Sequence, residues 1–155
     1  MNKAYDYLVI GAGSGGLASA KRAASYGAKV AIFESARIGG TCVNQGCVPK
    51  KVMWNAATLA EHMHELPAYG FPVQPQTFQW SSFVEKRDAY VRRLNDIHRR
   101  NIDNANVDYI TGHACFQEDH CVRVNSECYT APHILIATGG KPRIPTDVKG
   151  HEQGI

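Results

Sequence analysis

Two cysteines close together in the chain, Cys42 and Cys47, are the residues best suited to chemistry. A thiol pair can change between a dithiol and a disulfide by exchange with another disulfide. The pair follows closely on a glycine-rich turn at 11–16, whose spacing is typical of dinucleotide-binding sites. Together the two segments put an electron-carrying cofactor beside thiols that can accept electrons. Their order and distance predict a flavin-linked disulfide reductase.

The spacing of the cysteines limits the local structure. In a regular α-helix, residues five positions apart are separated by about 7.5 Å along the axis. That exceeds the limit of roughly 7 Å between the Cα atoms of a disulfide. If the two cysteines bond, residues 43–46 cannot form an ideal helix. A thiolate near the start of the next helix, with Lys50 and Lys51 close by, would have a lowered pKa and react near neutral pH.

Two other interpretations of the cysteines compete. The pair could be free and buried, or it could bind zinc together with His62 and His64. The spacing matches no usual zinc pattern, so no metal is expected. A reducing cytoplasm also argues against a disulfide scaffold. The later cysteines are interpreted as ordinary strand residues: Cys115, Cys121 and Cys128.

The segments on either side of the glycine turn support a dinucleotide-binding site over a chance match. Gly11, Gly13 and Gly16 follow a strand-like run and open a helix. The helix start would offer N–H groups to a pyrophosphate. Glu34 ends the second strand, and its carboxylate suits a ribose hydroxyl pair and disfavours a 2′-phosphate. The turn therefore predicts the adenosine half of FAD or NAD, and a packing turn without a ligand is the alternative.

The pattern of the whole chain predicts an α/β fold, because strands alternate with helices from the first residues onward. A loop is expected at 67–75, and no element is expected after Gly140. An antiparallel excursion is expected from 107 to 130, followed by a buried parallel strand. The predicted strands are 5–10, 29–33, 107–111, 114–117, 121–124, 128–130 and 133–137, and the predicted helices are 17–26, 52–65 and 81–101.

Composition excludes several classes of function. The chain has 155 residues and a formal net charge of +3, which is too small to indicate nucleic-acid binding. Basic residues between 86 and 100 alternate with apolar ones at helical spacing, so they are interpreted as a solvated helix face. No apolar stretch approaches the roughly 20 residues that span a bilayer. With no leader segment recognised, a cytoplasmic protein without membrane contacts is expected.

Three segments, at 11–20, 39–54 and 133–140, resemble the N-terminal part of the pyridine-nucleotide disulfide oxidoreductases. The similarity covers essentially all 155 residues. It implies one Rossmann-like FAD-binding domain over 1–155, with a parallel sheet and a small antiparallel β-meander. Lys51 and the residues after it favour the members that reduce glutathione disulfide. The members that act on trypanothione or thioredoxin share much of this segment and remain open.

The resemblance implies a flow of electrons from NADPH through FAD and a Cys42–Cys47 disulfide to glutathione disulfide. Cys47 would lie beside the flavin, Cys42 would attack the substrate, and Lys50 would tune the flavin ring. Ser14, Lys21 and His98 match positions that contact glutathione. The positions that match the FAD site are Gly11, Gly13, Ser14, Gly15, Gly16, Glu34, Thr41, Cys42, Lys50, Ala114, Thr138 and Gly139.

The same resemblance implies parts that this sequence does not contain. Members of the family carry a second dinucleotide turn for NADPH and an interface domain that donates an acid/base histidine across a homodimer. No second Gly-x-Gly-x-x-Gly occurs here, so this chain alone is not expected to complete turnover. Two other classes remain as alternatives: an NAD-dependent dehydrogenase domain, and a thiol or metal-binding module without enzymatic activity.

Overall fold

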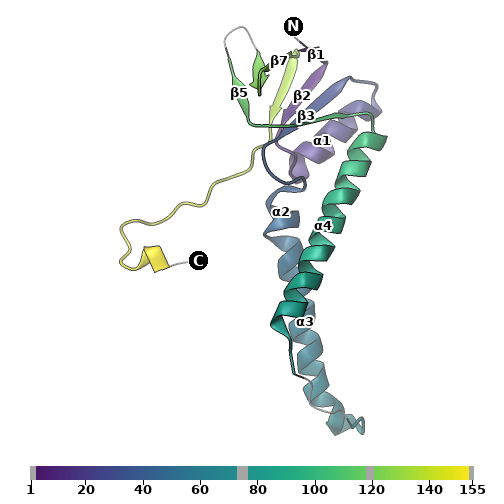
Figure 1. The fold of residues 1–155 in the computed structure, drawn as a ribbon, viewed down its shortest axis with the longest axis vertical. Helices are drawn as coiled ribbons and strands as arrows, with labels where there is room; N and C mark the ends of the chain where they lie inside the picture. Colours follow the sequence, from purple (N-terminus) through teal and green to yellow (C-terminus); the bar gives the residue numbers. More distant parts are fainter. Residues whose placement is uncertain (1–2, 73–76, 118–120, 154–155) are drawn as a thin grey trace.

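Two four-stranded sheets form the body of the protein in the computed structural model, which describes residues 3–72, 77–117 and 121–153 (Figure 1). The parallel sheet has the order β4-β3-β2-β8, with β2 at Tyr7–Ile10, β3 at Val30–Glu34, β4 at Asp108–Thr111 and β8 at His133–Ile136. The second sheet has the order β1-β7-β6-β5, with β1 at Lys3–Ala4, β5 at Ala114–Phe116, β6 at Val122–Val124 and β7 at Glu127–Thr130. The predicted α/β fold with a parallel sheet and an antiparallel meander is confirmed.

Two strands differ from their predicted places. The segment 107–111 was expected to open the antiparallel excursion, but β4 pairs in parallel with β3, from Ala31↔Asp108 to Glu34↔Thr111. A long helix precedes β4, and a helical crossover is the connection that parallel strands require. The strand expected over 5–10 is shorter, because β2 begins at Tyr7 and pairs with β3 and β8. A separate strand that was not predicted, β1, precedes it and pairs with β7.

Among the described residues, four α-helices and two short 3₁₀ helices accompany the sheets. The α-helices are α1 at Ser14–Ser25, α2 at Gly40–Asn44, α3 at Cys47–Glu65 and α4 at Trp80–Asn104. The 3₁₀ helices are η1 at Leu66–Tyr69 and η2 at His151–Gln153. Both lie in segments where no element was predicted, and residues 73–75 of the expected loop lie outside the described residues.

α3 begins five positions earlier than the predicted start at residue 52. The predicted start lies after Pro49. Pro49 instead occupies the third position of the first turn, where a backbone amide has no partner within the helix. Proline is tolerated there because the hydrogen bond that it cannot donate is absent anyway. The earlier start makes Cys47 the first residue of α3.

The core lies on both faces of the parallel sheet, because successive side chains of β2 and β3 point to opposite sides. One cluster joins the sheet to α1 and α4: Val9, Leu17, Ala20, Val30, Ile32, Ile102 and Val107. The other joins the sheet to the meander: Leu8, Ile10, Ala31, Phe33, Val122, Val124 and Tyr129. The molecule therefore has three layers, with helices on one side of the parallel sheet and the second sheet on the other.

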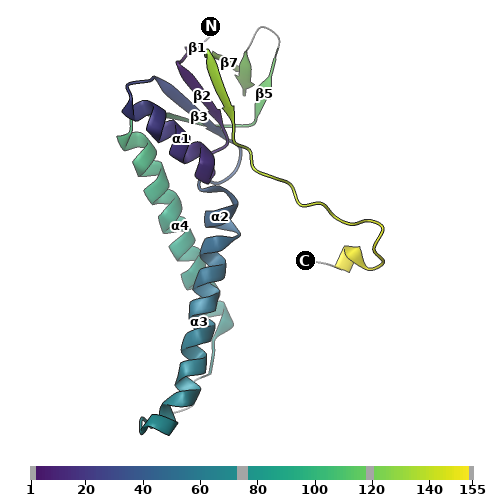
Figure 2. The ribbon, with the colours of Figure 1, turned by 180° about the vertical axis from the view of Figure 1, so that it is seen from behind.

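The helices α3 and α4 form an arm that extends away from the sheets (Figures 1 and 2). α3 has no buried residue, and α4 buries Val91 and Ile102. After β8 the chain leaves the sheets on the other side from the arm (Figure 2). None of the helices in the described ranges combines the length and apolar character needed to cross a membrane.

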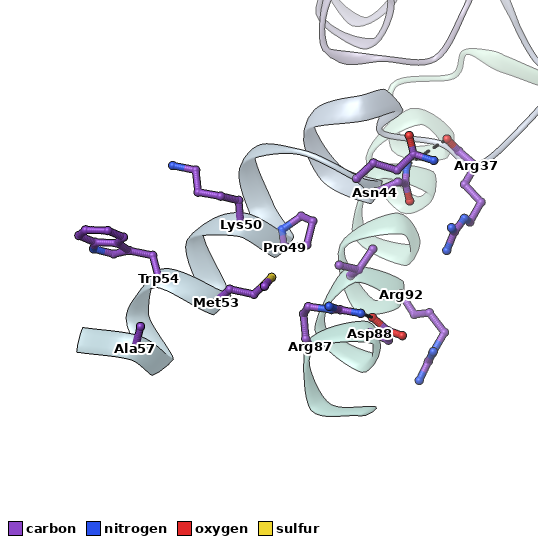
Figure 3. Close-up of a pocket in the computed structure, with 12 residues that line it drawn as sticks. Arg37, Asn44, Pro49, Lys50, Met53, Trp54, Ala57, Arg87, Asp88 and Arg92 are labelled. Atoms are coloured by element: carbon purple, nitrogen blue, oxygen red, sulfur yellow. Dashed lines mark hydrogen bonds and ion pairs between the residues drawn. The ribbon is translucent and has the colours of Figure 1, made fainter. Parts of the chain in front are cut away.

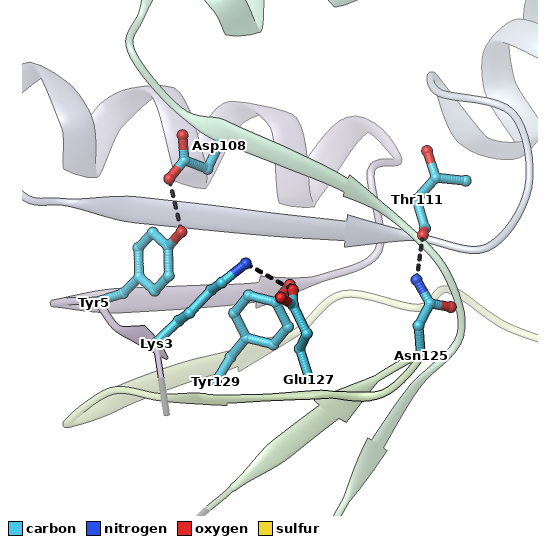
Figure 4. A network of polar contacts seen from close by, with 7 residues as sticks. All are labelled: Lys3, Tyr5, Asp108, Thr111, Asn125, Glu127 and Tyr129. Atoms are coloured by element: carbon cyan, nitrogen blue, oxygen red, sulfur yellow. Dashed lines mark hydrogen bonds and ion pairs between the residues drawn. The ribbon is translucent and has the colours of Figure 1, made fainter. Parts of the chain in front are cut away.

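Polar contacts connect the two sheets at their edges (Figure 4). The Tyr5 hydroxyl donates to Asp108 Oδ2 at 2.7 Å, joining the segment before β2 to β4. Asn125 Nδ2, in the turn between β6 and β7, donates to the carbonyl oxygen of Thr111 at 3.2 Å. The meander is therefore fixed to the carboxyl end of β4, and the segment between β1 and β2 is fixed to its other end.

Candidate cofactor and thiol site

A cavity of about 720 Å³ opens where the carboxyl ends of the parallel strands meet. This is the edge at which open α/β sheets bind ligands, and the volume is in the range of cofactor and ligand pockets. The predicted cofactor residues that line it are Gly11, Gly13, Ser14, Gly15, Glu34, Thr41, Cys42, Ala114, Thr138 and Gly139. Segments far apart in the sequence are thus brought to one cavity.

Two predicted cofactor residues are absent from the cavity lining, Gly16 and Lys50. Gly16 is buried, and a Cβ built on it would lie 1.9 Å from the carbonyl oxygen of Gly11. Only glycine fits that contact between α1 and the preceding turn. Gly16 therefore acts by packing, which agrees with the role that the motif assigns to its last glycine.

The start of α1 faces the cavity without a side-chain cap. Gly13 is the N-cap residue and no side chain hydrogen bonds there. Gly13, Ser14 and Gly15 all line the cavity. A helix of this length offers unpaired N–H groups and a partial positive charge at its first turn, which together suit an anionic group such as a pyrophosphate.

Glu34 marks the other side of the dinucleotide turn. It ends β3, and its carboxylate accepts hydrogen bonds at 2.8 Å from the backbone amides of Ala12 and Ala36. The side chain is half-buried and lines the cavity. Its acceptor oxygens fit a neutral ribose hydroxyl and would repel a phosphate. The predicted place of Glu34 at the strand end is confirmed, and its contact with a ribose stays a prediction.

The two thiols lie on either side of a break between helices. Cys42 is on α2, and Cys47 begins α3 after the break at Gln45–Gly46. The amide of Gly46 donates to the carbonyl oxygen of Thr41 at 2.7 Å, which closes the end of α2. The helix is therefore interrupted between the two cysteines, as the sequence analysis required for a bonded pair. Both thiols are free, with Cys42 half-buried and Cys47 exposed.

The neighbouring thiol controls the protonation of Cys42. Its pKa is raised, first by the side-chain hydrogen bond with Cys47, then by burial, then by the charge that Cys47 can carry. A hydrogen bond with the Cys47 backbone acts in the opposite direction and offsets only part of the increase. The pKa of Cys42 is therefore raised, because a close thiolate opposes a second negative charge.

Two asparagines that the sequence analysis missed hold the segment before the thiols. Asn44 Nδ2 donates to the carbonyl oxygens of Ile38 and Gly40 at 3.1 and 2.9 Å. Asn95, on α4, donates to Ile38 O at 2.7 Å and to Asn44 Oδ1 at 3.0 Å. The position of Asn95 in the sequence could have identified it. Asn95 lies four residues after Val91, which is buried, so the helical repeat places this uncharged polar side chain on the inner face of α4.

Other lining residues were also missed by the sequence analysis. They share a position just beyond the carboxyl ends of the parallel strands or in the segment around the thiols. They include Ser35, Ala36, Arg37, Gly40, Asn44, Gln45, Gly112, His113 and Ala137. Because β4 belongs to the parallel sheet, Gly112 and His113 lie just beyond its carboxyl end. Open α/β sheets bind ligands at this edge, which is also where Glu34 ends β3.

Lys50 lies in a separate groove of about 800 Å³ between α3 and α4. Figure 3 shows Met53 of α3 pointing toward α4 and Arg87 of α4 pointing toward Asp88, while Lys50 and Trp54 extend away from α4. Arg87 pairs with the adjacent Asp88 at 2.8 Å. The groove does not include the thiols. We therefore place the candidate site in the cavity with Cys42, and a role for Lys50 beside a cofactor stays a prediction.

The predicted substrate residues fall into two places. Lys21 of α1 and half-buried His98 of α4 are neighbours, since burial and then the charge of Lys21 lower the pKa of His98. Ser14 lies apart from them, in the cavity lining. Their contact with glutathione stays a prediction.

The zinc alternative does not agree with the fold. His62 lies 15 positions after Cys47 in the same helix, which corresponds to roughly 22 Å along its axis. His64 is farther still. Within the described residues, no group of three or more His, Cys, Asp or Glu side chains is arranged to hold a metal ion.

The chain matches the model of one protein family and is similar to curated proteins from three organisms. A family model described as pyridine nucleotide-disulphide oxidoreductase matches residues 5–155. Curated glutathione reductases are similar to the chain: that of Yarrowia lipolytica is 55% identical over 97% of this chain, and that of Schizosaccharomyces pombe 51% over 100%. The glutathione reductase of Debaryomyces hansenii is 49% identical over 97%. The chain spans only 35–36% of the length of these relatives.

Proposed function

Because this chain belongs to the pyridine nucleotide-disulphide oxidoreductase family, we propose that it forms the FAD-binding part of an NADPH-dependent glutathione-disulfide reductase. The observation that supports this most directly is the single cavity lined by both the dinucleotide turn and Cys42. The names of the similar proteins support glutathione disulfide as the substrate. Related reductases for trypanothione or thioredoxin are the alternatives.

The residues present fit FAD. The uncapped start of α1 would bind the pyrophosphate, and the Glu34 carboxylate would accept from a ribose hydroxyl. Thr41 and Cys42 lie in the same cavity, where the redox-active part would be held. FAD, when bound, supplies a route for two electrons from NADPH to the thiol pair. The side chains around the cavity then orient the cofactor and limit water near the sulfur atoms.

The thiols would carry the substrate chemistry by exchange. The Cys42 thiolate attacks one sulfur of glutathione disulfide, the S–S bond breaks, and one glutathione leaves as a thiolate that takes up a proton. Cys47 then attacks the Cys42 sulfur, which forms the Cys42–Cys47 disulfide and releases the second glutathione. Two electrons and two protons restore the dithiol. The raised pKa of Cys42 supports a resting pair in which Cys42 keeps its proton.

The remaining parts of the reaction would come from outside these 155 residues. We propose that NADPH binds at a second nucleotide site, and that an acid/base histidine is donated across a homodimer. The lack of a second glycine turn and the short share of the relatives that this chain spans support this division. On this proposal the 155-residue chain does not complete turnover alone, and the intact enzyme works in the cytoplasm.

The test uses the intact protein with its bound flavin. NADPH oxidation is measured with glutathione disulfide, trypanothione disulfide and oxidised thioredoxin as separate substrates. Cys42→Ser is expected to keep the flavin and a long-wavelength thiolate–flavin band, but to lose glutathione-disulfide reduction. Cys47→Ser is expected to lose the band, and Cys115→Ser serves as a control that keeps both. A protein without visible flavin absorbance refutes the proposal, and a band that survives in Cys47→Ser reverses the roles of the thiols.

A further inference from the structure

A second cysteine pair lies in the meander, away from the cavity. Cys121 and Cys128 are joined by a disulfide, with their Cα atoms 5.6 Å apart. This separation is within the usual range for such bonds. The sequence analysis interpreted both as ordinary strand residues, so the bond corrects that interpretation. Neither residue lines the cavity that holds Cys42.

The register of the hairpin explains why the two sulfurs meet. A two-residue turn separates β6 from β7, and Arg123 pairs opposite Cys128. Alternating side chains of a strand point to opposite faces, so Cys121, Arg123 and Cys128 share one face. Val122 and Val124 occupy the opposite face and are buried in the core. The disulfide therefore lies on the outer face of the sheet, where both cysteines are only half-buried.

A third cysteine on that face provides a natural control. Cys115 of β5 pairs opposite Arg123, so β6 lies between Cys115 and Cys128. Two strand spacings amount to about 9.6 Å, which is too far for a disulfide. Cys115 is free and exposed, and its sulfur lies 3.6 Å from His113 Nδ1. Accessibility alone therefore does not determine which cysteines pair.

We propose that Cys121 and Cys128 form a second thiol–disulfide exchange site, which small disulfides such as glutathione disulfide oxidise. This goes beyond the proposed function and uses none of its residues. One thiolate of the pair attacks the small disulfide and releases one thiol. The other cysteine then attacks the resulting mixed disulfide, which forms the Cys121–Cys128 bond and releases the second thiol. A dithiol reverses the reaction by the same two steps.

Charge near the pair suits an anionic reactant. Arg123 is exposed and stands in the same row as Cys128 and Cys115. A guanidinium beside a thiol favours its thiolate and attracts carboxylates such as those of glutathione. The outer face of the meander thus combines two sulfurs close enough to bond with a fixed positive charge.

The bond closes the hairpin that supports the cavity from behind. β6 and β7 place Val122, Val124 and Tyr129 against the parallel sheet. β6 also pairs with β5, whose first residue, Ala114, lines the cavity. A crosslink within the hairpin restricts its unfolded states, so the oxidised protein is expected to melt at a higher temperature than the reduced protein.

The cleavage specificity of trypsin makes the pairing directly measurable. Trypsin cuts after Arg123, between the two cysteines, and yields peptides 101–123 and 124–143. The intact protein is equilibrated in buffers of rising glutathione disulfide to glutathione ratio, its free thiols are blocked, and it is digested. Mass spectrometry is expected to find the two peptides joined at high ratio and separate at low ratio. No joined pair at any ratio overturns the proposal.

Variants identify the sulfur atoms, because peptide 101–123 contains both Cys115 and Cys121. Cys115→Ser is expected to leave the joined pair unchanged, and Cys121→Ser to abolish it. Loss of the pair in Cys115→Ser, or its survival in Cys121→Ser, contradicts the assignment. A protein carrying both Cys42→Ser and Cys47→Ser is expected to form the pair normally. That result separates the second site from the proposed reductase activity, because either can fail without the other.

Discussion

The backbones of Gly13 and Gly40 lie directly against each other, so that a Cβ built on Gly40 would be 2.8 Å from the Gly13 Cα. The amide of Gly39 also donates to the carbonyl oxygen of Ala12 at 2.8 Å. The dinucleotide turn and the helix that carries Cys42 are therefore one packed unit. This contact sets the distance between the cofactor end of the cavity and its sulfur end.

Gly40→Ala is expected to separate these two segments. Gly40 has a φ of 62°, and a left-handed backbone costs an ordinary residue about 1–2 kcal/mol before the clash with Gly13 is added. Urea unfolding of the intact protein should show a loss of at least that size, together with a lower flavin content. Gly140→Ala is the matched control, because its Cβ would meet nothing within 4 Å. Equal stability of the two variants would contradict the importance of the contact.

The Cys42 thiol is expected to change its pH dependence when its neighbour is removed. Cys47 is the largest cause of the raised pKa of Cys42, so Cys47→Ser should lower the pH at which Cys42 is half alkylated. Iodoacetamide labelling followed by peptide mass spectrometry measures this midpoint. Cys115→Ser removes a distant thiol and should leave the midpoint unchanged. A midpoint that stays fixed in Cys47→Ser would show that burial dominates instead.

Lys21 is expected to influence the titration of His98. Its charge is the second cause of the lowered pKa of His98, after burial. Lys21→Gln should therefore raise the pKa of His98 part of the way to its ordinary value, as followed by NMR of the imidazole protons. Lys21→Arg keeps the charge and should leave the pKa low. An identical shift in both variants would mean that packing, and not charge, links the two residues.

Tyr129 is expected to make stability fall at alkaline pH. Burial, then the hydrogen bond to Glu127, then nearby negative charge raise its pKa to about 12. The phenol ionises near pH 10 when unfolded. Since the folded pKa is the higher one, this contribution is complete below about pH 10 and is lost as the pH rises toward 12. The contact is drawn in Figure 4.

Urea unfolding at a series of alkaline pH values tests this expectation. Tyr129→Phe should have a shallower fall in stability between these limits than the unchanged protein. Tyr26→Phe is the control, because Tyr26 is 76% exposed. If the unfolding free energy of both variants falls with pH as steeply as that of the unchanged protein, Tyr129 does not contribute to the fall.

Local chemistry made part of the site predictable from sequence. The glycine turn and Glu34 depend on neighbouring residues, so their places at the ends of β2 and β3 followed from the motif. The rise of an α-helix per residue indicated that a bonded Cys42–Cys47 pair requires a break in the helix between them. The same reasoning misplaced the start of α3, because Pro49 is unfavourable inside a helix and tolerated in its first turn.

Contacts between distant segments were not predictable in this way. Asn95 meets Ile38 across 57 positions, and β4 joins the parallel sheet only because α4 returns the chain to it. The pairing of Cys121 with Cys128 depends on the length of one turn, since a single added residue would move one sulfur to the other face. These features depend on register and packing, which composition and spacing do not determine.

The first described segment of the chain, residues 3–10, contributes β1 to one sheet and β2 to the other. Between them, the amide of Tyr5 donates to Thr130 at 3.0 Å and that of Asp6 to Lys29 at 2.9 Å. One short stretch of backbone is thus tied to both layers, so sideways slip of one layer over the other would break both ties. The relative positions of Gly11 and Ala114, which both line the cavity, therefore depend on residues 3–6 outside its lining. Deleting those residues should loosen the cavity.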